Sequence, residues 1–433
     1  MYKKGGNMLL KFNFRNFKSF KDEASLDLTA TKISEFSDRN FEVGNTKVLP
    51  IASIFGANAS GKSNVMEAFK FMVDYIVFSL NFAGAQINPN LQLSAMKPIP
   101  FLFNDKSSEE GTTFEVYFIV NTDRTEKIYQ YGFVIKGNVV EEEWLNYKAK
   151  TSRDDFKTIF YRLQNKNDEN DFSGLDKDIV KNIEVSMQKE TLILTLGAKL
   201  KEKTLSEIFN WFNTIININF GNEVETNRMY AMTGMLRRLL NEGVQKEIAK
   251  YLASFDSNIK NVIAEEKEVD SITKQKIISV YLTHNIEGSD KSINIPLLYE
   301  SAGTQKMFHL YPYFESVIRV GGTIFLDELN SKLHPLLIRV IIQLFANKSI
   351  NKKGAQIIFT SHDIWQLKSD VMRRDEIWFT EKNERGESTL YSLSDFIDEN
   401  GEKIRKDEDY QKNYILGKYG AIPNLKGFEG VFD

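Results

Sequence analysis

The segment VLPIASIFGANASGKS, residues Val48–Ser63, constrains the fold of this 433-residue chain more than any other. Its apolar first half ends at Gly56, as expected of a strand that is buried on both faces of a sheet. Its second half fits the pattern G-x-x-x-x-G-K-[ST], and apolar residues recur at helical spacing after Lys62. A strand, a glycine loop and a helix in this order predict an α/β domain with a phosphate-binding loop.

The residue types of this loop indicate its chemistry. Gly56 and Gly61 allow the backbone to wrap closely, so that successive N–H groups point at phosphate oxygens. Lys62 is predicted to reach the β- and γ-phosphates of a nucleotide as a catalytic residue, and the Ser63 hydroxyl to bind Mg²⁺. The predicted phosphate-contacting set is Gly56, Ala57, Asn58, Ala59, Ser60, Gly61, Lys62, Ser63 and Asn64. The simpler alternative is a glycine turn that only precedes a helix.

Two further apolar runs end in polar residues. TIFLDELN (Thr323–Asn330) delivers Asp327, which is predicted to hold the hydration shell of Mg²⁺, and Glu328, which is predicted to polarise the attacking water as general base. IIFTSHD (Ile357–Asp363) delivers His362, whose neutral imidazole is expected to hydrogen-bond the γ-phosphate or that water. The alternatives are solvated acids at a strand end and a surface histidine in a turn.

The string YESAGTQ (Tyr299–Gln305) leads into a predicted helix that begins near Ser301. Ser301, Gly303 and Thr304 would then offer hydroxyl and N–H groups to an anion at a helix N-terminus. The simpler interpretation is that Ser301 only caps the helix. Because the chain already has one phosphate loop, a second cradle is more useful for a nucleotide held by another subunit.

The remaining histidines have structural interpretations. His334 precedes a proline and is expected to start the next helix, His309 lies among apolar residues, and His284 is given no role. No pair of histidines has metal-ligand spacing, and the chain has no cysteine. These facts exclude a cysteine nucleophile and a disulfide scaffold, and they argue against a transition-metal site held by the protein.

Composition narrows the class of protein. The chain has 56 Lys plus Arg and 59 Asp plus Glu, which argues against nonspecific coating of nucleic acid but leaves room for a local basic groove. No charge-free apolar run is long enough to span a membrane, and the N-terminus has no apolar signal core. We therefore expect a cytoplasmic protein without a membrane segment. Met8 is a second candidate for the natural start.

The pattern of strands and helices divides the chain into three segments. Residues 1–172 are predicted to form an antiparallel β subdomain and the strand, loop and helix described above. Residues 173–266 have helical spacing of apolar residues and no heptad repeat, so we predict a helical insertion without a long coiled coil. Residues 267–433 return to strands alternating with helices, which completes one α/β domain.

The order of these motifs resembles that of the ATP-binding-cassette (ABC) ATPases of the SMC/RecF type: P-loop, helical insertion, signature loop, paired acids, D-loop and switch histidine. The opening FNFRNFKSFKD also resembles the first strands of that group. More narrowly, ESAGTQ, DELNSKLHPLL, FTSHD and NYILGKYGAIP resemble the RloA-like (AAA_15/AAA_21 type) ATPases. Those ATPases occur with restriction and abortive-infection loci, typically beside a RloB-like partner with a TOPRIM nuclease fold.

The resemblance implies an ABC-type head that uses ATP and Mg²⁺ and forms a head-to-tail homodimer, or a higher homo-oligomer, with shared ATP sites. Ser301, Gly303 and Gln305 would form the signature loop, which contacts the γ-phosphate of ATP held by the other subunit. Asn330 and Ser331 would belong to the D-loop at the dimer interface.

Two features depart from the family pattern. Ala302 and Thr304 do not fit the S-G-G-Q form of the signature, so the local geometry can differ. The glutamine of the Q-loop is left open among Gln86, Gln92 and Gln130.

The sequence thus predicts a Mg²⁺-dependent ATPase, the sensor of an anti-phage defence system that controls an effector such as a TOPRIM nuclease. A RecF-like, ATP-dependent DNA repair or DNA-binding factor shares every motif and is the main alternative, so nucleic acid stays a possible partner. A nuclease acting by itself is disfavoured because few residues follow His362 and they lack a paired D-x-D. A scaffold in which ATP acts as structural glue is a fourth interpretation.

Overall fold

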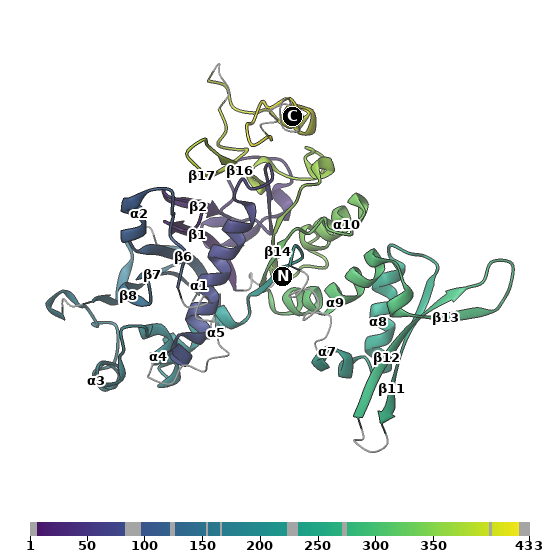
Figure 1. Ribbon diagram of the computed structural model, residues 1–433, viewed down its shortest axis with the longest axis horizontal. Helices are drawn as coiled ribbons and strands as arrows, with labels where there is room; N and C mark the ends of the chain where they lie inside the picture. Colours follow the sequence, from purple (N-terminus) through teal and green to yellow (C-terminus); the bar gives the residue numbers. More distant parts are fainter. Residues whose placement is uncertain are drawn as a thin grey trace, which may run out of the picture. The chain divides into compact units, whose positions relative to one another are not determined.

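The computed structural model describes residues 7–82, 97–121, 126–152, 155–164, 167–222, 233–270, 275–397 and 401–423. Two compact units are present, and each is described by itself. Unit 1 comprises Met1–Asn217, Val317–Asp327 and Ile342–Asp433, and unit 2 comprises Ile218–Ser316 and Glu328–Ile341. Figure 1 labels many of their helices and strands.

A six-stranded sheet of mainly parallel strands supports the phosphate loop. Its strand order is β10-β14-β15-β5-β16-β17, and β14, β15, β5 and β16 run parallel to one another. The bounds are β5 (Ile51–Phe55), β10 (Ile216–Asn219), β14 (Thr323–Asp327), β15 (Gln356–Thr360), β16 (Ile377–Lys382) and β17 (Ser388–Ser392). Every residue of β5, β14 and β15 is buried, which explains their continuous apolar sequences. Because these strands are parallel, their carboxyl ends lie at one edge of the sheet.

An antiparallel sheet in unit 1 has the order β2-β1-β6-β7-β8-β9. Its strands are β1 (Met8–Arg15), β2 (Ala24–Asp27), β6 (Thr112–Asn121), β7 (Glu126–Lys136), β8 (Val139–Ala149) and β9 (Lys157–Leu163), and β3 (Phe41–Val43) pairs separately with β4 (Thr46–Val48). Helix α1 (Lys62–Phe82) joins the two large sheets through aromatic rings. Phe69 of α1 lies 4.9 Å from the ring of Phe12 in β1 and 4.0 Å from that of Phe325 in β14. The helix that follows the phosphate loop is therefore fixed on both sides.

The other helices of unit 1 are α2 (Asp105–Glu109), α3 (Lys177–Ser186), α4 (Ile193–Lys199), α5 (Lys203–Asn213) and α11 (Tyr410–Ile415). Its short 3-10 helices are η1 (Ser37–Arg39), η3 (Asn167–Glu169), η5 (Ile364–Gln366) and η6 (Arg374–Glu376). The long helices α9 (Ala302–Val320) and α10 (Pro335–Ala346) begin in unit 2 and end in unit 1. Within the described part of the chain, no helix has the length and apolar character that crossing a membrane requires.

Unit 2 contains α7 (Thr233–Arg238), α8 (Glu242–Ala253), η4 (Leu297–Tyr299) and an antiparallel sheet of β11 (Ile259–Asp270), β12 (Gln275–Asn285) and β13 (Ser292–Pro296). Leu252 of α8, Val262 of β11 and Leu282 of β12 are fully buried and form the core of this unit. His284 of β12 lies 2.8 Å from the Glu300 carboxylate through Nε2, which ties the sheet to the segment before α9.

The predicted α/β arrangement, the strand before the phosphate loop, the helix after it and the N-terminal antiparallel strands are all confirmed. The predicted helical stretch 173–266 is wrong in part because it contains β10 and the start of β11. Ile215 and Ile216 continue the apolar face of α5 in sequence, but that helix ends at Asn213 and Thr214 caps it. The three segment boundaries themselves stay a prediction about the organisation of the chain.

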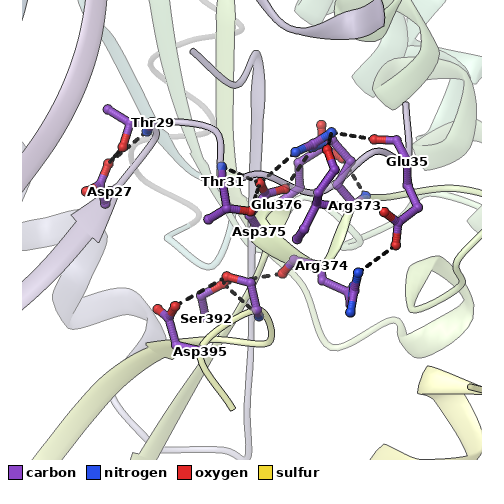
Figure 2. A network of polar contacts seen from close by, with 12 residues as sticks. Asp27, Thr29, Thr31, Glu35, Arg373, Arg374, Asp375, Glu376, Ser392 and Asp395 are labelled. Atoms are coloured by element: carbon purple, nitrogen blue, oxygen red, sulfur yellow. Dashed lines mark hydrogen bonds and ion pairs between the residues drawn. The ribbon is translucent and has the colours of Figure 1, made fainter. Parts of the chain in front are cut away.

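Unit 1 also contains a buried network of polar contacts around Arg373, which is 1% exposed (Figure 2). Its guanidinium donates from Nε to Oδ1 of Asp375 at 2.8 Å and from Nη2 to Oδ2 at 2.7 Å. Its Nη1 donates to the carbonyl oxygens of Ile33 and Glu35. The N–H and hydroxyl of Thr31 complete the network by donating to Asp375 Oδ2 at 2.9 and 2.7 Å. The chain after β2 is thereby tied to the segment that starts β16.

Replacing Arg373 with Met should destabilise unit 1 by about 3–5 kcal/mol, because the buried Asp375 would lose its cation. Urea unfolding followed by circular dichroism measures this effect. Arg405→Met is the matched control, since Arg405 makes the same fork to Asp407 at the surface, with the two side chains 72% and 61% exposed. The control should change the free energy of unfolding by less than about 1 kcal/mol. Equal effects of the two variants would contradict a structural role for the buried network.

Candidate functional site

The phosphate loop has a backbone that only glycine permits at two positions. Gly56 has φ +150° and Gly61 has φ +116°. A Cβ on Gly56 would lie 2.4 Å from the carbonyl oxygen of Thr380, and one on Gly61 would lie 2.8 Å from Ser388 Oγ. Positive φ and close approach both exclude a larger side chain. Both glycines of the predicted motif are thus explained by the fold of unit 1.

Side chains from distant segments hold the loop in this shape. Ser60 Oγ lies 2.6 Å from Thr380 Oγ1 of β16. Ser388 Oγ, at the start of β17, donates to the carbonyl oxygen of Ser60 at 2.7 Å and lies 2.8 Å from Ser19 Oγ. Asn64 Nδ2 donates to the same Ser19 oxygen at 2.6 Å. The β16–β17 hairpin and the turn after β1 therefore clamp the loop and the first turn of α1 together.

Lys62 lies across the arc that the loop forms. Its side chain is 5% exposed, and its Nζ donates to the carbonyl oxygens of Gly56 at 2.8 Å and Ala57 at 2.9 Å. Asn58 and Ala59 are exposed at the tip of the loop, and Ser63 is half-buried in the first turn of α1. The ammonium group is thus held at the mouth of a backbone cradle, at the positive end of a helix.

The parallel strands bring two further predicted residues of unit 1 to the same edge of the sheet. Asp327 ends β14, is 3% exposed, and accepts a hydrogen bond of 2.5 Å from Thr360 Oγ1 at the end of the neighbouring strand β15. His362 is exposed two residues after β15. The next strand in the sheet is β5, which leads into the phosphate loop. A carboxylate, an imidazole and a phosphate cradle therefore share one edge.

Glu328 follows Asp327 in the chain and is the first residue of its segment of unit 2. Its φ of +54° is left-handed, a conformation that costs a non-glycine residue about 1–3 kcal/mol. Its carbonyl oxygen accepts from the N–H of Ser331 at 3.0 Å, and that of Asn330 accepts from Leu333 at 3.1 Å. The predicted general base and the predicted D-loop residues thus belong to one tight turn, residues 328–333.

The signature segment caps α9 as its local interpretation predicted. Ser301 Oγ accepts from the N–H of Thr304 at 3.1 Å and lies 2.8 Å from Thr304 Oγ1. Gln305 Nε2 donates to the carbonyl oxygen of Glu300 at 2.8 Å. Ser301 and Ala302 are exposed, so the N-terminus of this helix is accessible within unit 2. The cap is confirmed, and contact with a nucleotide of another subunit stays a prediction.

Lys306 was missed by sequence reasoning, and it connects α9 to the turn 328–333. The side chain is 1% exposed, and its Nζ donates to the carbonyl oxygens of Leu329 and Ser331, both at 2.8 Å. The same Nζ lies 3.5 Å from the ring centroid of Phe220. Because lysine side chains are rarely buried, the sequence suggested that Lys306 would be exposed to solvent. The available signal was its place beside Met307 and Phe308 in an apolar run.

The histidines given structural interpretations behave as expected. Burial lowers the pKa of His309 to about 4, so this imidazole is neutral at pH 7. His334 Nδ1 accepts from the N–H of Leu336 at 3.2 Å at the start of α10. Among the described residues, no cluster of His, Asp or Glu has the geometry to hold a metal ion without other ligands.

Two of the three candidates for the Q-loop, Gln86 and Gln92, lie outside the described residues. Gln130 lies in β7 and donates from Nε2 to Glu115 at 2.6 Å and to the Tyr117 hydroxyl at 2.9 Å. These partners are side chains of the antiparallel sheet. The assignment of the glutamine stays open.

Comparisons with known proteins identify the family of the chain. The profile of the family described as "AAA domain, putative AbiEii toxin, Type IV TA system" matches residues 51–364, most of the chain, and the chain belongs to that family. The resemblance to ATPases of this group is thereby confirmed. The SMC head domain from Thermotoga maritima is a similar solved structure, with 15% identity, a TM-score of 0.37, and coverage of 89% of this chain and 98% of that one. No curated protein has significant sequence similarity to the chain.

Lys306 should give unit 2 a pH-dependent stability. Burial, aided by the positive charge of Lys332 and opposed by Glu328, lowers the pKa of Lys306 from its ordinary value of 10.5 to about 7. Between these values the unfolded state binds more protons than the folded state, so the stability contributed by Lys306 rises with pH above 7. The difference in unfolding free energy between the wild type and Lys306→Met should therefore increase from pH 7 to 9 in urea titrations.

Lys246→Met is the control for this measurement, because Lys246 is exposed on α8 of the same unit and does not act on the Lys306 amine. It should show a nearly constant difference from the wild type. A constant difference for Lys306→Met would mean that the buried amine keeps its ordinary pKa.

Proposed function

We propose that this chain binds and hydrolyses ATP with Mg²⁺, and that two copies share each pair of ATP sites. The observation that carries the proposal is the phosphate cradle of unit 1, with Lys62 across it and the Asp327 carboxylate at the same edge of a parallel sheet. Membership of an AAA family supports nucleotide hydrolysis as the reaction.

The geometry of the loop fits a triphosphate. The absence of a Cβ at Gly56 and Gly61 leaves backbone N–H groups able to approach phosphate oxygens. Lys62 donates to two carbonyl oxygens, and phosphate oxygens carry more negative charge and accept more strongly. Its ammonium would therefore turn from Gly56 and Ala57 toward the β- and γ-phosphates without leaving the cradle.

The donor set also suits Mg²⁺, which prefers oxygen ligands and keeps several waters. Ser63 would supply its hydroxyl as a direct ligand, and Asp327, oriented by Thr360, would hold water of the hydration shell. When bound, Mg²⁺ neutralises charge that develops on the phosphates during transfer. The buried position of Asp327 strengthens its interaction with a cation.

Glu328 and His362 would act on the attacking water. Glu328 would accept its proton as general base, and the left-handed turn that it opens fixes the direction in which the carboxylate leaves the chain. His362 would hydrogen-bond the water or the γ-phosphate. Exposure of the imidazole allows it to change partner as the nucleotide state changes.

The position of the predicted signature segment supports sharing of the site. Ser301, Gly303, Thr304 and Gln305 lie at the N-terminus of the long helix α9, which provides N–H groups and a positive helix end for an anion. Unit 1 already supplies such a helix end through α1. A second one in unit 2 would serve the γ-phosphate of ATP held by another copy, which makes closure of the dimer dependent on ATP.

Ser301→Arg should abolish ATP-dependent dimerisation and hydrolysis, because the large side chain would occupy the contact with the partner's nucleotide. Binding of ATP to the chain's own phosphate loop should stay close to that of the wild type. Analytical ultracentrifugation with and without ATP, with calorimetric titration of ATP, measures both quantities. Loss of ATP binding itself would exclude a shared site.

Lys62→Ala and Glu328→Gln should separate binding from turnover. The first should lose ATP binding, because the cradle loses its cation. The second should bind ATP and dimerise, while the hydrolysis rate falls about 10²–10⁴-fold through loss of the base. A Glu328→Gln variant that hydrolyses ATP at the wild-type rate would remove Glu328 from the mechanism.

We further propose that ATP-driven closure regulates a protein effector, such as a TOPRIM nuclease, in a defence system. The support is the family description, which refers to a toxin of a toxin–antitoxin system. Affinity purification from the native host in ATP and in ADP tests this, and the expected result is a partner that exchanges with nucleotide state. DNA-stimulated hydrolysis without such a partner would favour the RecF-like function.

A further inference from the structure

An exposed apolar surface lies near the phosphate loop within unit 1. Ile99, Leu102 and Phe103 are 50%, 64% and 72% exposed, although large apolar side chains are usually buried. We call these three residues the 99–103 patch. Phe103 has the largest exposed fraction of the three and presents an aromatic ring to its surroundings.

The backbone of the patch is held by hydrogen bonds to the turn after β1. The N–H of Phe101 donates to Asn16 Oδ1 at 3.0 Å, and the N–H of Lys18 donates to the carbonyl oxygen of Ile99 at 2.8 Å. The Phe101 ring is 1% exposed and meets the Phe103 ring edge to face, with centroids 5.6 Å apart. The exposed ring is therefore supported by a buried one and by that turn.

The same turn contacts the phosphate loop. Ser19, next to Lys18 in sequence, accepts from Asn64 Nδ2 in the first turn of α1. This is the turn of the helix that contains Lys62 and Ser63. Residues 18 and 19 thus link the backbone of the patch to the first turn of α1.

The β16–β17 hairpin makes a second connection. A Cβ on Gly386 would lie 2.8 Å from Cδ2 of Phe103, so the ring packs against the hairpin. Ser388, two residues further on, touches Ser60 and the space beside Gly61. Two residues of extended chain span at most about 7 Å. Phe103 and the phosphate loop therefore contact positions of one hairpin that are only two residues apart.

We propose that Phe103 stacks on the base of the nucleotide whose phosphates lie in the cradle. This inference rests on the proposed function and adds the base-binding contact to it. An aromatic ring next to a phosphate site offers a π-face at low entropic cost, and stacking against a base uses that face. Leu102 and Ile99 extend the apolar surface beside the ring.

Stacking accepts any base, because every base has a π-face. Phe103 should therefore strengthen the binding of ATP and GTP alike. It should not change the affinity for inorganic tripolyphosphate, because that ligand has no base. Comparison of these three ligands separates a contact with the base from a contact with phosphate.

The test is calorimetric titration of the full chain with ATP, GTP and tripolyphosphate, for the wild type, Phe103→Ala and Phe103→Tyr. Phe103→Ala should weaken ATP and GTP binding about tenfold and leave tripolyphosphate binding unchanged. Phe103→Tyr keeps the ring and should restore wild-type affinity. Leu416→Ala is the control, since Leu416 is a 70% exposed apolar side chain elsewhere in unit 1.

Three results for Phe103→Ala would overturn the inference. They are wild-type affinity for ATP, equal losses of affinity for ATP and tripolyphosphate, and a change in self-association alone, which would assign the patch to a protein contact. Thermal unfolding of each variant shows whether it is folded. If the Phe103→Ala variant does not fold, the titrations are compared between the wild type and the Phe103→Tyr variant. Failure of the wild type to bind either ATP or tripolyphosphate would instead contradict the proposed function.

Discussion

The β16–β17 hairpin packs directly on the phosphate loop, and this contact sets the geometry of the site in unit 1. Thr380 and Ser388 approach Gly56 and Gly61 so closely that no side chain fits at either glycine. The packing requires β16 to lie beside β5, and the buried Arg373–Asp375 network fixes the start of β16 (Figure 2). Residues more than 300 positions apart in the chain therefore shape one short loop. A loop held in this way can bind phosphate with preformed N–H groups.

The division of the chain gives the two units different chemistry. Unit 1 holds the phosphate cradle, Asp327 and His362, whereas unit 2 holds the N-terminus of α9 and the turn that begins at Glu328. Strand β10, helices α9 and α10, and the bond between Asp327 and Glu328 pass from one unit to the other. In unit 2, Lys306 ties the first turns of α9 to the turn 328–333 through two carbonyl oxygens. A displacement of the N-terminus of α9 would thus be transmitted through Lys306 to the turn that begins at Glu328, the residue proposed as the general base.

Much of the fold could be predicted because apolar periodicity is strong in fully buried strands. The runs ending at Phe55, Asp327 and Thr360 are strands, and the glycine pattern between strand and helix located the loop. The secondary structure of the middle of the chain was harder to predict. Ile215 and Ile216 extend an apolar helical face in sequence, yet they follow a helix end and lead into β10, because pairing within a sheet outweighs local periodicity. The apolar face of Leu236, Leu240 and Val244 is likewise interrupted at Asn241, which caps α8.

Residue types at fixed spacing were enough to define the class of protein, since a phosphate loop, paired acids and a strand-borne histidine are all visible in the amino-acid sequence. The cap at Ser301 was equally accessible, because capping is a local interaction. The side chains that hold the loop, the burial of Lys306 and the packing of Phe103 against the β16–β17 hairpin became evident only in the folded chain. Those features join segments that are distant in sequence, and their contacts depend on strand order and register. Neither is encoded in the spacing of any one motif.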